Sequence, residues 1–411
     1  MMNDNRIKRA SFFWNALFAG TNALQSAVIL FAASRRMDIS VAGMLTIGFT
    51  IGNLAAIVAR YGMRNFQVTD VREEYSFSDY FHCRIVTFIG SLAVSVAYLA
   101  VLMATGRNSG DKTIIIFGII LLKLLGAIEE VFVGRLQQQG RLDIGARIAS
   151  VRVLVSTFAI FISIWFISSI FICILLGIAA EVAVDLLMIP KGKKYTSFRI
   201  GKIEKSSIKT LLIAGLPLCI GTALHNYIGN GPKYLVDLYF EDGMQAICGY
   251  IMMPMFVLSI LNLFIMQPAV KGIGDAWNRE DKSLFRSKAR KHIGILSGLS
   301  VAVLIGGYLL GLPVLSWMYD VDLLPYRKEF LLLMAGGGVF TITSYMIVLL
   351  TAMRKQKGIV WGCVIAVALY IGLGKLFVQT WGFMGTCLLY IAVNLIMMGV
   401  FILFMRGKKT C

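Results

Sequence analysis

Histidines and paired cysteines are scarce in this sequence. Only three histidines occur in 411 residues, and the seven cysteines are scattered, with no CxxC pair and no spacing typical of metal ligands. A structural zinc site needs several such ligands close together, and a disulfide framework needs cysteines at paired spacings. We therefore expect no bound metal, no cofactor and no disulfide.

The signatures of soluble enzymes are also missing. The chain has no HExxH motif, no Walker loop, no Ser/His/Asp set and no GxGxxG in a βαβ setting. No segment between apolar runs is long enough to form a folded domain outside a membrane. The first apolar run, 12–33, is too long for a cleavable signal peptide and lacks a small-residue cleavage site. We expect a protein that is not an enzyme and does not itself hydrolyse ATP.

Long apolar runs are what the chain has in abundance. Hydrophobic residues make up 58% of it and charged residues only 15%. A bilayer core of roughly 30 Å is crossed by about 20 apolar residues in a helix, so we expect an all-α integral membrane protein with about twelve spans. They are predicted near 12–33, 40–60, 84–104, 113–135, 145–167, 169–189, 208–238, 244–267, 292–316, 329–352, 358–377 and 382–405.

Basic residues fall mainly in alternate connecting segments. With the N-terminus in the cytoplasm, about 30 lysines and arginines lie on the inner side and about six on the outer side. The formal net charge of +18 therefore indicates a positive-inside topology rather than a nucleic-acid partner. Both termini are predicted to be cytoplasmic. The six outer residues are Arg35, Arg36, Arg107, Lys112, Arg327 and Lys328.

The basic segment Lys191–Lys209 divides the chain into two halves of about six helices. We predict an N-terminal lobe over 1–195, a cytoplasmic linker over 196–207 and a C-terminal lobe over 208–411, arranged around a central cavity. A faint repeat fits this division, because Gly20-Thr21 recurs as Gly221-Thr222 and Gly43-Met44 recurs as Gly243-Met244. Two parallel halves of this kind are related by an axis along the membrane normal.

The stretch 215–233 opens the second half and contains both apolar residues and helix breakers. Proline removes a backbone donor and glycine tolerates unusual backbone angles, so the span 208–238 is predicted to be broken. We expect a hinge there, formed by Pro217, Gly229, Gly231 and Pro232.

Ionisable residues inside the predicted spans are the main site candidates. A charge at mid-membrane costs about 2.5–3.5 kcal/mol on insertion scales, so it usually faces protein or a wet cavity. Lys123 and Arg152 are predicted to contact an anionic substrate. Glu129, Glu130, Glu181 and Asp185 would balance these bases or take up protons. The structural alternative has Arg152 pairing with Glu130 or Glu181 and only holding the lobe together.

Other polar residues complete the candidate set. The first helix carries Asn15, Asn22 and Gln25 at near-helical spacing, which indicates either a cavity lining or bonds between helices. In the broken span, Asn226, Asn230 and Lys233 are secondary cavity candidates. His225 is a candidate proton carrier, and equally a packing residue.

The stretch Ile57-Val-Ala-Arg-Tyr-Gly-Met-Arg-Asn-Phe-Gln-Val-Thr-Asp-Val-Arg72, together with the polar first helix and the broken seventh, resembles the Wzx-type polysaccharide and O-antigen flippases. These belong to the MATE-like multidrug/oligosaccharidyl-lipid/polysaccharide (MOP) superfamily. The resemblance implies two six-helix lobes and transfer of undecaprenyl-pyrophosphate-linked oligosaccharide across a bacterial plasma membrane. It carries over no catalytic residue.

The leading hypothesis is thus a flippase for lipid-linked oligosaccharide, working by alternating access. Membrane lipids, a polysaccharide polymerase and glycosyltransferases are expected partners. The alternatives are an ion-coupled small-molecule exporter of the multidrug type and, less favoured, a membrane glycan polymerase or ligase. Such enzymes usually carry a large outer loop, and the outer segments here are short.

Overall fold

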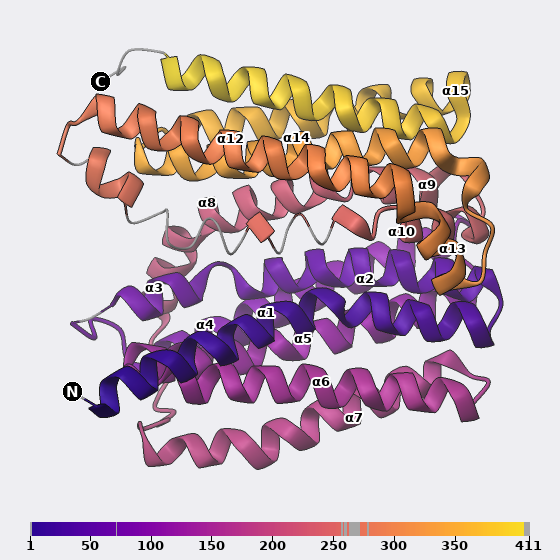
Figure 1. The fold of residues 1–411 in the computed structure, drawn as a ribbon. Helices are drawn as coiled ribbons and strands as arrows, with labels where there is room; N and C mark the ends of the chain where they lie inside the picture. The colour runs from indigo at the N-terminus through magenta and orange to yellow at the C-terminus, as the bar shows by residue number, and fades with distance from the viewer. Residues whose placement is uncertain are drawn as a thin grey trace. The chain divides into compact units, whose positions relative to one another are not determined.

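The computed structural model describes residues 2–70, 72–255, 258, 261–262, 272–277 and 279–406, and within these ranges it contains helices and no strands. Its first half consists of α1 (Met2–Arg36), α2 (Ile39–Arg60), α3 (Met63–Thr69), α4 (Phe77–Ala104), α5 (Gly110–Gln138), α6 (Leu142–Phe166), α7 (Ile170–Met188) and the 3₁₀ segment η1 (Ile189–Lys194) (Figure 1).

The second half begins with α8 (Lys205–Gly229), α9 (Gly231–Tyr239) and α10 (Asp242–Ile251). The elements described after α10 are α12 (Lys282–Gly306), the π-helical turn η2 (Gly307–Gly311), α13 (Leu312–Tyr319), η3 (Leu324–Tyr326), α14 (Arg327–Ala352) and α15 (Gln356–Arg406). Gly382 interrupts α15 with φ 57° and ψ −137°, so the predicted spans 358–377 and 382–405 lie on either side of a break.

The prediction of an all-α multi-pass membrane protein is confirmed. Among the described residues, nine helical segments are long and apolar enough to cross a membrane. α5 is not one of the nine, although it has 29 residues and covers the predicted span 113–135. The predicted span 244–267 lies partly outside the described residues. The number of twelve spans therefore stays a prediction.

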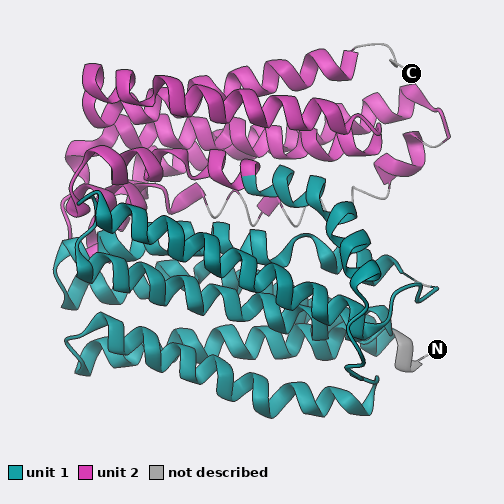
Figure 2. Ribbon diagram, turned by 180° about the vertical axis from the view of Figure 1, so that it is seen from behind, with its two compact units in different colours: residues 1–223 teal, residues 224–411 magenta. Residues whose placement is uncertain are grey.

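The chain divides into two compact units, 1–223 (unit 1) and 224–411 (unit 2) (Figure 2). Their boundary lies inside α8, beyond the basic linker predicted at 196–207. The lobe limits 1–195 and 208–411 stay a prediction.

Small residues bring the helices of unit 1 close to α5. A Cβ added at Gly48 of α2 would lie 3.4 Å from Ile119, and one added at Gly52 would lie 3.2 Å from Ile119 and from Lys123. Small residues let membrane helices approach closely. Such close packing matters because the hydrophobic effect does not drive helices together within lipid. As a result α5 contacts α2, α4, α6 and α7, and three of its charged residues, Lys112, Lys123 and Glu129, are buried.

The predicted break in the span 208–238 is present. α8 ends at Gly229, Asn230 has φ −106° and ψ 11°, and α9 starts with Pro232 in its first turn. Pro217 lies inside α8. A Cβ added at Gly229 would lie 2.6 Å from the ring of Phe340, so this glycine also serves close packing. The role of Pro217, Gly229, Gly231 and Pro232 as a hinge stays a prediction.

Candidate functional site

The candidate site lies in unit 1, around the middle and the C-terminal half of α5. This helix carries Lys123, Glu129 and Glu130, and the first two are almost fully buried. Their partners come from α1, α2, α4, α6 and α7. Because α5 is surrounded by these helices, each of its charges has to be matched by a polar group on a neighbour.

Arg152 of α6 forms the centre of a buried ion triad. Its Nε lies 2.5 Å from Oε2 of Glu129, and its Nη1 lies 2.6 Å from Oε2 of Glu181 on α7. All three side chains are less than 5% exposed. A Cβ added at Gly126 would lie 2.7 Å from Nη2 of Arg152, so this glycine makes room for the guanidinium. The geometry favours the structural alternative for Arg152, with Glu129 in place of Glu130.

Lys123 joins the same network through neutral groups. Its Nζ donates to Oε1 of Gln25 at 2.5 Å, the Gln25 amide donates to Oγ of Ser156, and that hydroxyl donates to Oε1 of Glu181 at 2.9 Å. The ammonium also lies 5.3 Å from the centre of the Phe49 ring. Among the described residues, no carboxylate lies within ion-pair distance of Lys123. It is a buried cation held by an amide and an aromatic face.

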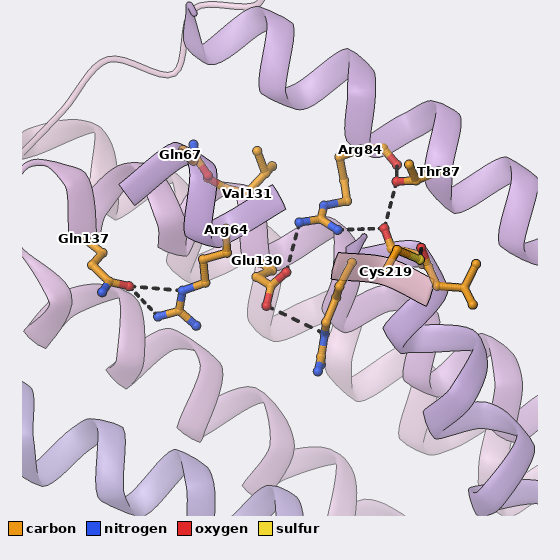
Figure 3. A network of polar contacts seen from close by, with 11 residues as sticks. Arg64, Gln67, Arg84, Thr87, Glu130, Val131, Gln137 and Cys219 are labelled. Carbon is orange, nitrogen blue, oxygen red and sulfur yellow. Dashed lines mark hydrogen bonds and ion pairs between the residues drawn. The ribbon is translucent and has the colours of Figure 1, made fainter. Parts of the chain in front are cut away.

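Glu130 pairs with Arg84, the first residue of the predicted span 84–104. Nη2 of Arg84 lies 2.9 Å from Oε2 of Glu130, and Nη1 of Arg84 donates to the carbonyl of Ala59 at 2.7 Å (Figure 3). Arg84 is 1% exposed. The predicted span began at residue 84, whereas α4 begins at Phe77. The capping box of Ser76 and Asp79 marks this start and is visible in the sequence.

A small cleft lies beside these networks, at the end of α2. Its volume is about 30 Å³, enough for a water molecule. Nε of Arg60 lies 3.8 Å from Oε1 of Glu130, while Arg64 donates two hydrogen bonds to Oε1 of Gln137 (Figure 3). Arg60 and Arg64 both belong to the stretch 57–72 that carries the resemblance. The cleft is lined by Asn15, Phe18, Arg60, Arg64, Gly126, Glu129, Glu130, Val133, Ala146 and Ala149.

Two buried carboxylate oxygens in this region have no hydrogen-bond partner among the described residues. They are Oε1 of Glu129 and Oδ1 of Asp185. Asp185 lies on α7, one turn beyond Glu181, and interacts electrostatically with Arg152. Three carboxylates therefore act on one guanidinium. Such a surplus of acceptors is suited to binding a proton.

The three polar residues predicted on the first helix lie in different surroundings. Asn15 lines the cleft, Gln25 is in the network, and Asn22 is half-buried without joining either, so the predicted polar stripe is divided.

In unit 2, the ammonium of Lys233 lies 3.4 Å from Oδ1 of Asn230, whose amide donates to the carbonyl of Asn226. His225 stacks on Phe340 and lies 3.2 Å from the hydroxyl of Ser344. This places His225 in a packed aromatic contact, with one polar partner.

In the part of the chain that the structure describes, no three His, Cys, Asp or Glu residues are grouped in a way that could hold a metal ion. The six cysteines described are all buried and free.

The sequence matches no known family profile and no curated protein. The fold, in contrast, is shared with solved transporters. The lipid II flippase MurJ in an inward closed conformation is 13% identical, with a TM-score of 0.69 over 98% of this chain and 87% of that one. The MATE multidrug transporter DinF-BH in complex with R6G is also 13% identical, with a TM-score of 0.69 over 98% and 95%.

A third neighbour is an inward-facing multidrug resistance MATE transporter of the MOP superfamily, 12% identical, with a TM-score of 0.66 over 96% of this chain and 93% of that one. Identities this low show the fold alone. The chain has the fold that MATE transporters and the MurJ flippase share.

Proposed function

We propose that the protein is a MOP-type transporter that moves undecaprenyl-pyrophosphate-linked oligosaccharide across a bacterial plasma membrane. The observation that carries the proposal is Lys123, a buried ammonium whose hydrogen bond goes to the uncharged Gln25. A cation kept inside a membrane protein without a carboxylate partner is costly, and it is suited to an anionic ligand. Pyrophosphate is such a ligand.

Arg60 and Arg64 extend this basic character toward the predicted cytoplasmic end of α2. Arg60 is 32% exposed and lies 3.8 Å from its nearest carboxylate oxygen, so its charge is only partly neutralised. A planar guanidinium binds phosphate oxygens in a bidentate manner. In this proposal the two arginines meet the substrate phosphates first, and Lys123 binds them when the units change conformation. Arg152 keeps the network in place and does not contact the substrate.

The unpartnered oxygens of Glu129 and Asp185 favour a second function, an ion-coupled small-molecule exporter. A proton bound there would couple to transport by changing the charge around Arg152. The two functions differ in their cargo. Complementation of a flippase-deficient strain and drug efflux in a pump-deficient host separate them, because only the flippase restores surface polysaccharide.

The test of the proposal is Lys123→Ala in a cell whose surface polysaccharide depends on this protein. We expect export to be abolished while the level of the membrane-inserted protein stays normal. The matched control is Lys375→Ala, which removes an exposed lysine of α15 and leaves export unchanged. Normal export by a well-inserted Lys123→Ala protein would remove Lys123 from the substrate site.

A further inference from the structure

Unit 2 contains a large cavity that the proposed transport function does not use. Its volume is about 900 Å³, at the upper end of the about 300–1,000 Å³ typical of small-molecule sites. It lies where the N-terminal part of α12 meets the C-terminal ends of α14 and α15, and these three helices run beside one another (Figure 1). We call it the basic cavity.

The rim of the basic cavity is strongly positive. Lys282, Arg286 and Arg290 are spaced four residues apart on α12 and therefore share one face of the helix. Lys355 and Arg406 add two more bases from the ends of α14 and α15. Nζ of Lys355 donates to the carbonyl of Phe404 at 2.7 Å, which joins these two helix ends at the rim. Glu280 is the one acidic residue among the described residues that line the cavity.

The floor of the cavity is apolar. Phe285, Ala289 and Leu349 belong to a buried cluster between α12 and α14, and Met353 and Met405 pack against it. Trp277 completes the wall, with its ring 5.1 Å from that of Phe285 in an edge-to-face arrangement. Tryptophan is enriched where a membrane protein meets the headgroup layer. The cavity therefore offers apolar surface and positive charge to one ligand at the same time.

We propose that the basic cavity binds an anionic phospholipid of the surrounding membrane. The phosphate would lie between Arg286 and Arg290, and an acyl chain would cover the apolar floor. A soluble phosphate would leave that floor in water, and a zwitterionic lipid would bring a positive headgroup toward five bases. The predicted topology places this end of unit 2 at the cytoplasmic leaflet, where anionic lipids attract basic pockets between helices.

The test measures quenching of Trp277 by brominated lipids in nanodiscs that contain the full-length protein. The contribution of Trp277 is the difference between the wild type and Trp277→Phe, because the chain has six tryptophans. We expect brominated phosphatidylglycerol to quench Trp277 at low mole fraction and brominated phosphatidylcholine to quench it only weakly. In the Arg286→Gln/Arg290→Gln variant, half-quenching should need about ten times more phosphatidylglycerol.

The matched control is Lys193→Gln/Lys194→Gln, which removes the same charge from exposed residues of η1 in unit 1. In this variant, brominated phosphatidylglycerol should quench Trp277 as it does in the wild type. Equal quenching by the two lipids would overturn the proposal. So would two double variants that need the same amount of phosphatidylglycerol for half-quenching. Displacement in the wild type is a check that does not depend on how a variant folds. Unbrominated phosphatidylglycerol should relieve quenching and glycerol phosphate should not. Relief by glycerol phosphate would show a soluble-anion site instead.

Discussion

Units 1 and 2 bury different kinds of polar residue. The described part of unit 2 buries a single charged side chain, Lys233, and otherwise buries uncharged groups such as Gln245, Thr343 and Asn394. Among its described residues, unit 1 buries eight charged side chains, four of each sign. They are Asp79, Arg84, Lys112, Lys123, Glu129, Asp143, Arg152 and Glu181.

The two units thus differ in their buried charges, and they differ also in the regularity of their helices. Buried charges are costly in a membrane protein, so a matched partner, a helix cap such as that of Asp79, or a ligand has to offset the cost. Unit 2 carries three interruptions: the break at Asn230, the π-helical turn η2 and the positive φ of Gly382. Unit 1 has one between α2 and α3, at the left-handed residues Tyr61 and Gly62. In the proposed transport function, unit 1 would supply the charge chemistry and unit 2 most of the changes in helix geometry.

The largest effect is expected from breaking the ion triad of unit 1. Arg152→Met leaves Glu129 and Glu181 buried without their cation, and loss of one partner of a buried pair costs about 3–5 kcal/mol. We expect this drop in the free energy of unfolding, measured by denaturant titration in detergent. Arg147→Met is the matched control, because Arg147 is an exposed residue of the same helix whose guanidinium lies over the ring of Trp14.

A compensating variant shows whether the loss comes from unbalanced charge. In Arg152→Met/Glu129→Gln/Glu181→Gln all three charges are removed together, so much of the lost stability should return. If this variant were as unstable as Arg152→Met alone, the triad would matter for its packing rather than its charge.

Sequence reasoning predicted the class of the fold and, as the structural alternative, an Arg152–Glu181 pair, but not which of Glu129 and Glu130 meets Arg152. The apolar runs follow from the lipid environment. A helix in lipid must form all its backbone hydrogen bonds internally and present apolar side chains to the lipid. Glu129 and Glu130, in contrast, are neighbours that point about 100° apart on α5. Which of them meets Arg152 and which meets Arg84 depends on the rotation of α5 against α4 and α6. That rotation is set by packing at Gly126 and Gly52, which a hydropathy pattern does not reveal.

A moderate effect is expected in unit 2 from filling space at the helix break. Gly229→Ala places a methyl group 2.6 Å from the ring of Phe340, and overpacking of this kind costs about 1–3 kcal/mol. Gly221→Ala is the matched control in the same helix, since its Cβ would meet no atom within 4 Å. This change should be neutral or should stabilise by up to about 1 kcal/mol through helix propensity.

The same pair of variants tests the predicted hinge. If Gly229 is needed for packing, the variant loses thermal stability in detergent. If Gly229 is needed for bending, stability stays at the wild-type level and only transport falls. Equal stability of the two alanine variants would therefore contradict the packing interpretation.

The smallest effect is expected from an ion pair of unit 1 that is exposed. Oε1 of Glu73 lies 2.8 Å from Nη1 of Arg135, and the hydrogen bond from Arg135 lowers the pKa of Glu73 below its ordinary value. A carboxyl with a lowered folded-state pKa adds stability above the unfolded pKa of about 4.3, and this stability is lost as the pH falls through the folded value. Because Glu73 is 46% exposed, we expect Glu73→Gln to cost at most about 0.5 kcal/mol at pH 7, and nothing once both states are protonated. Unfolding titrations from pH 7 to pH 3 measure this difference, with the exposed neighbour Glu74→Gln as control. A loss as large as that of Arg152→Met would mean that burial is not what separates the two kinds of ion pair.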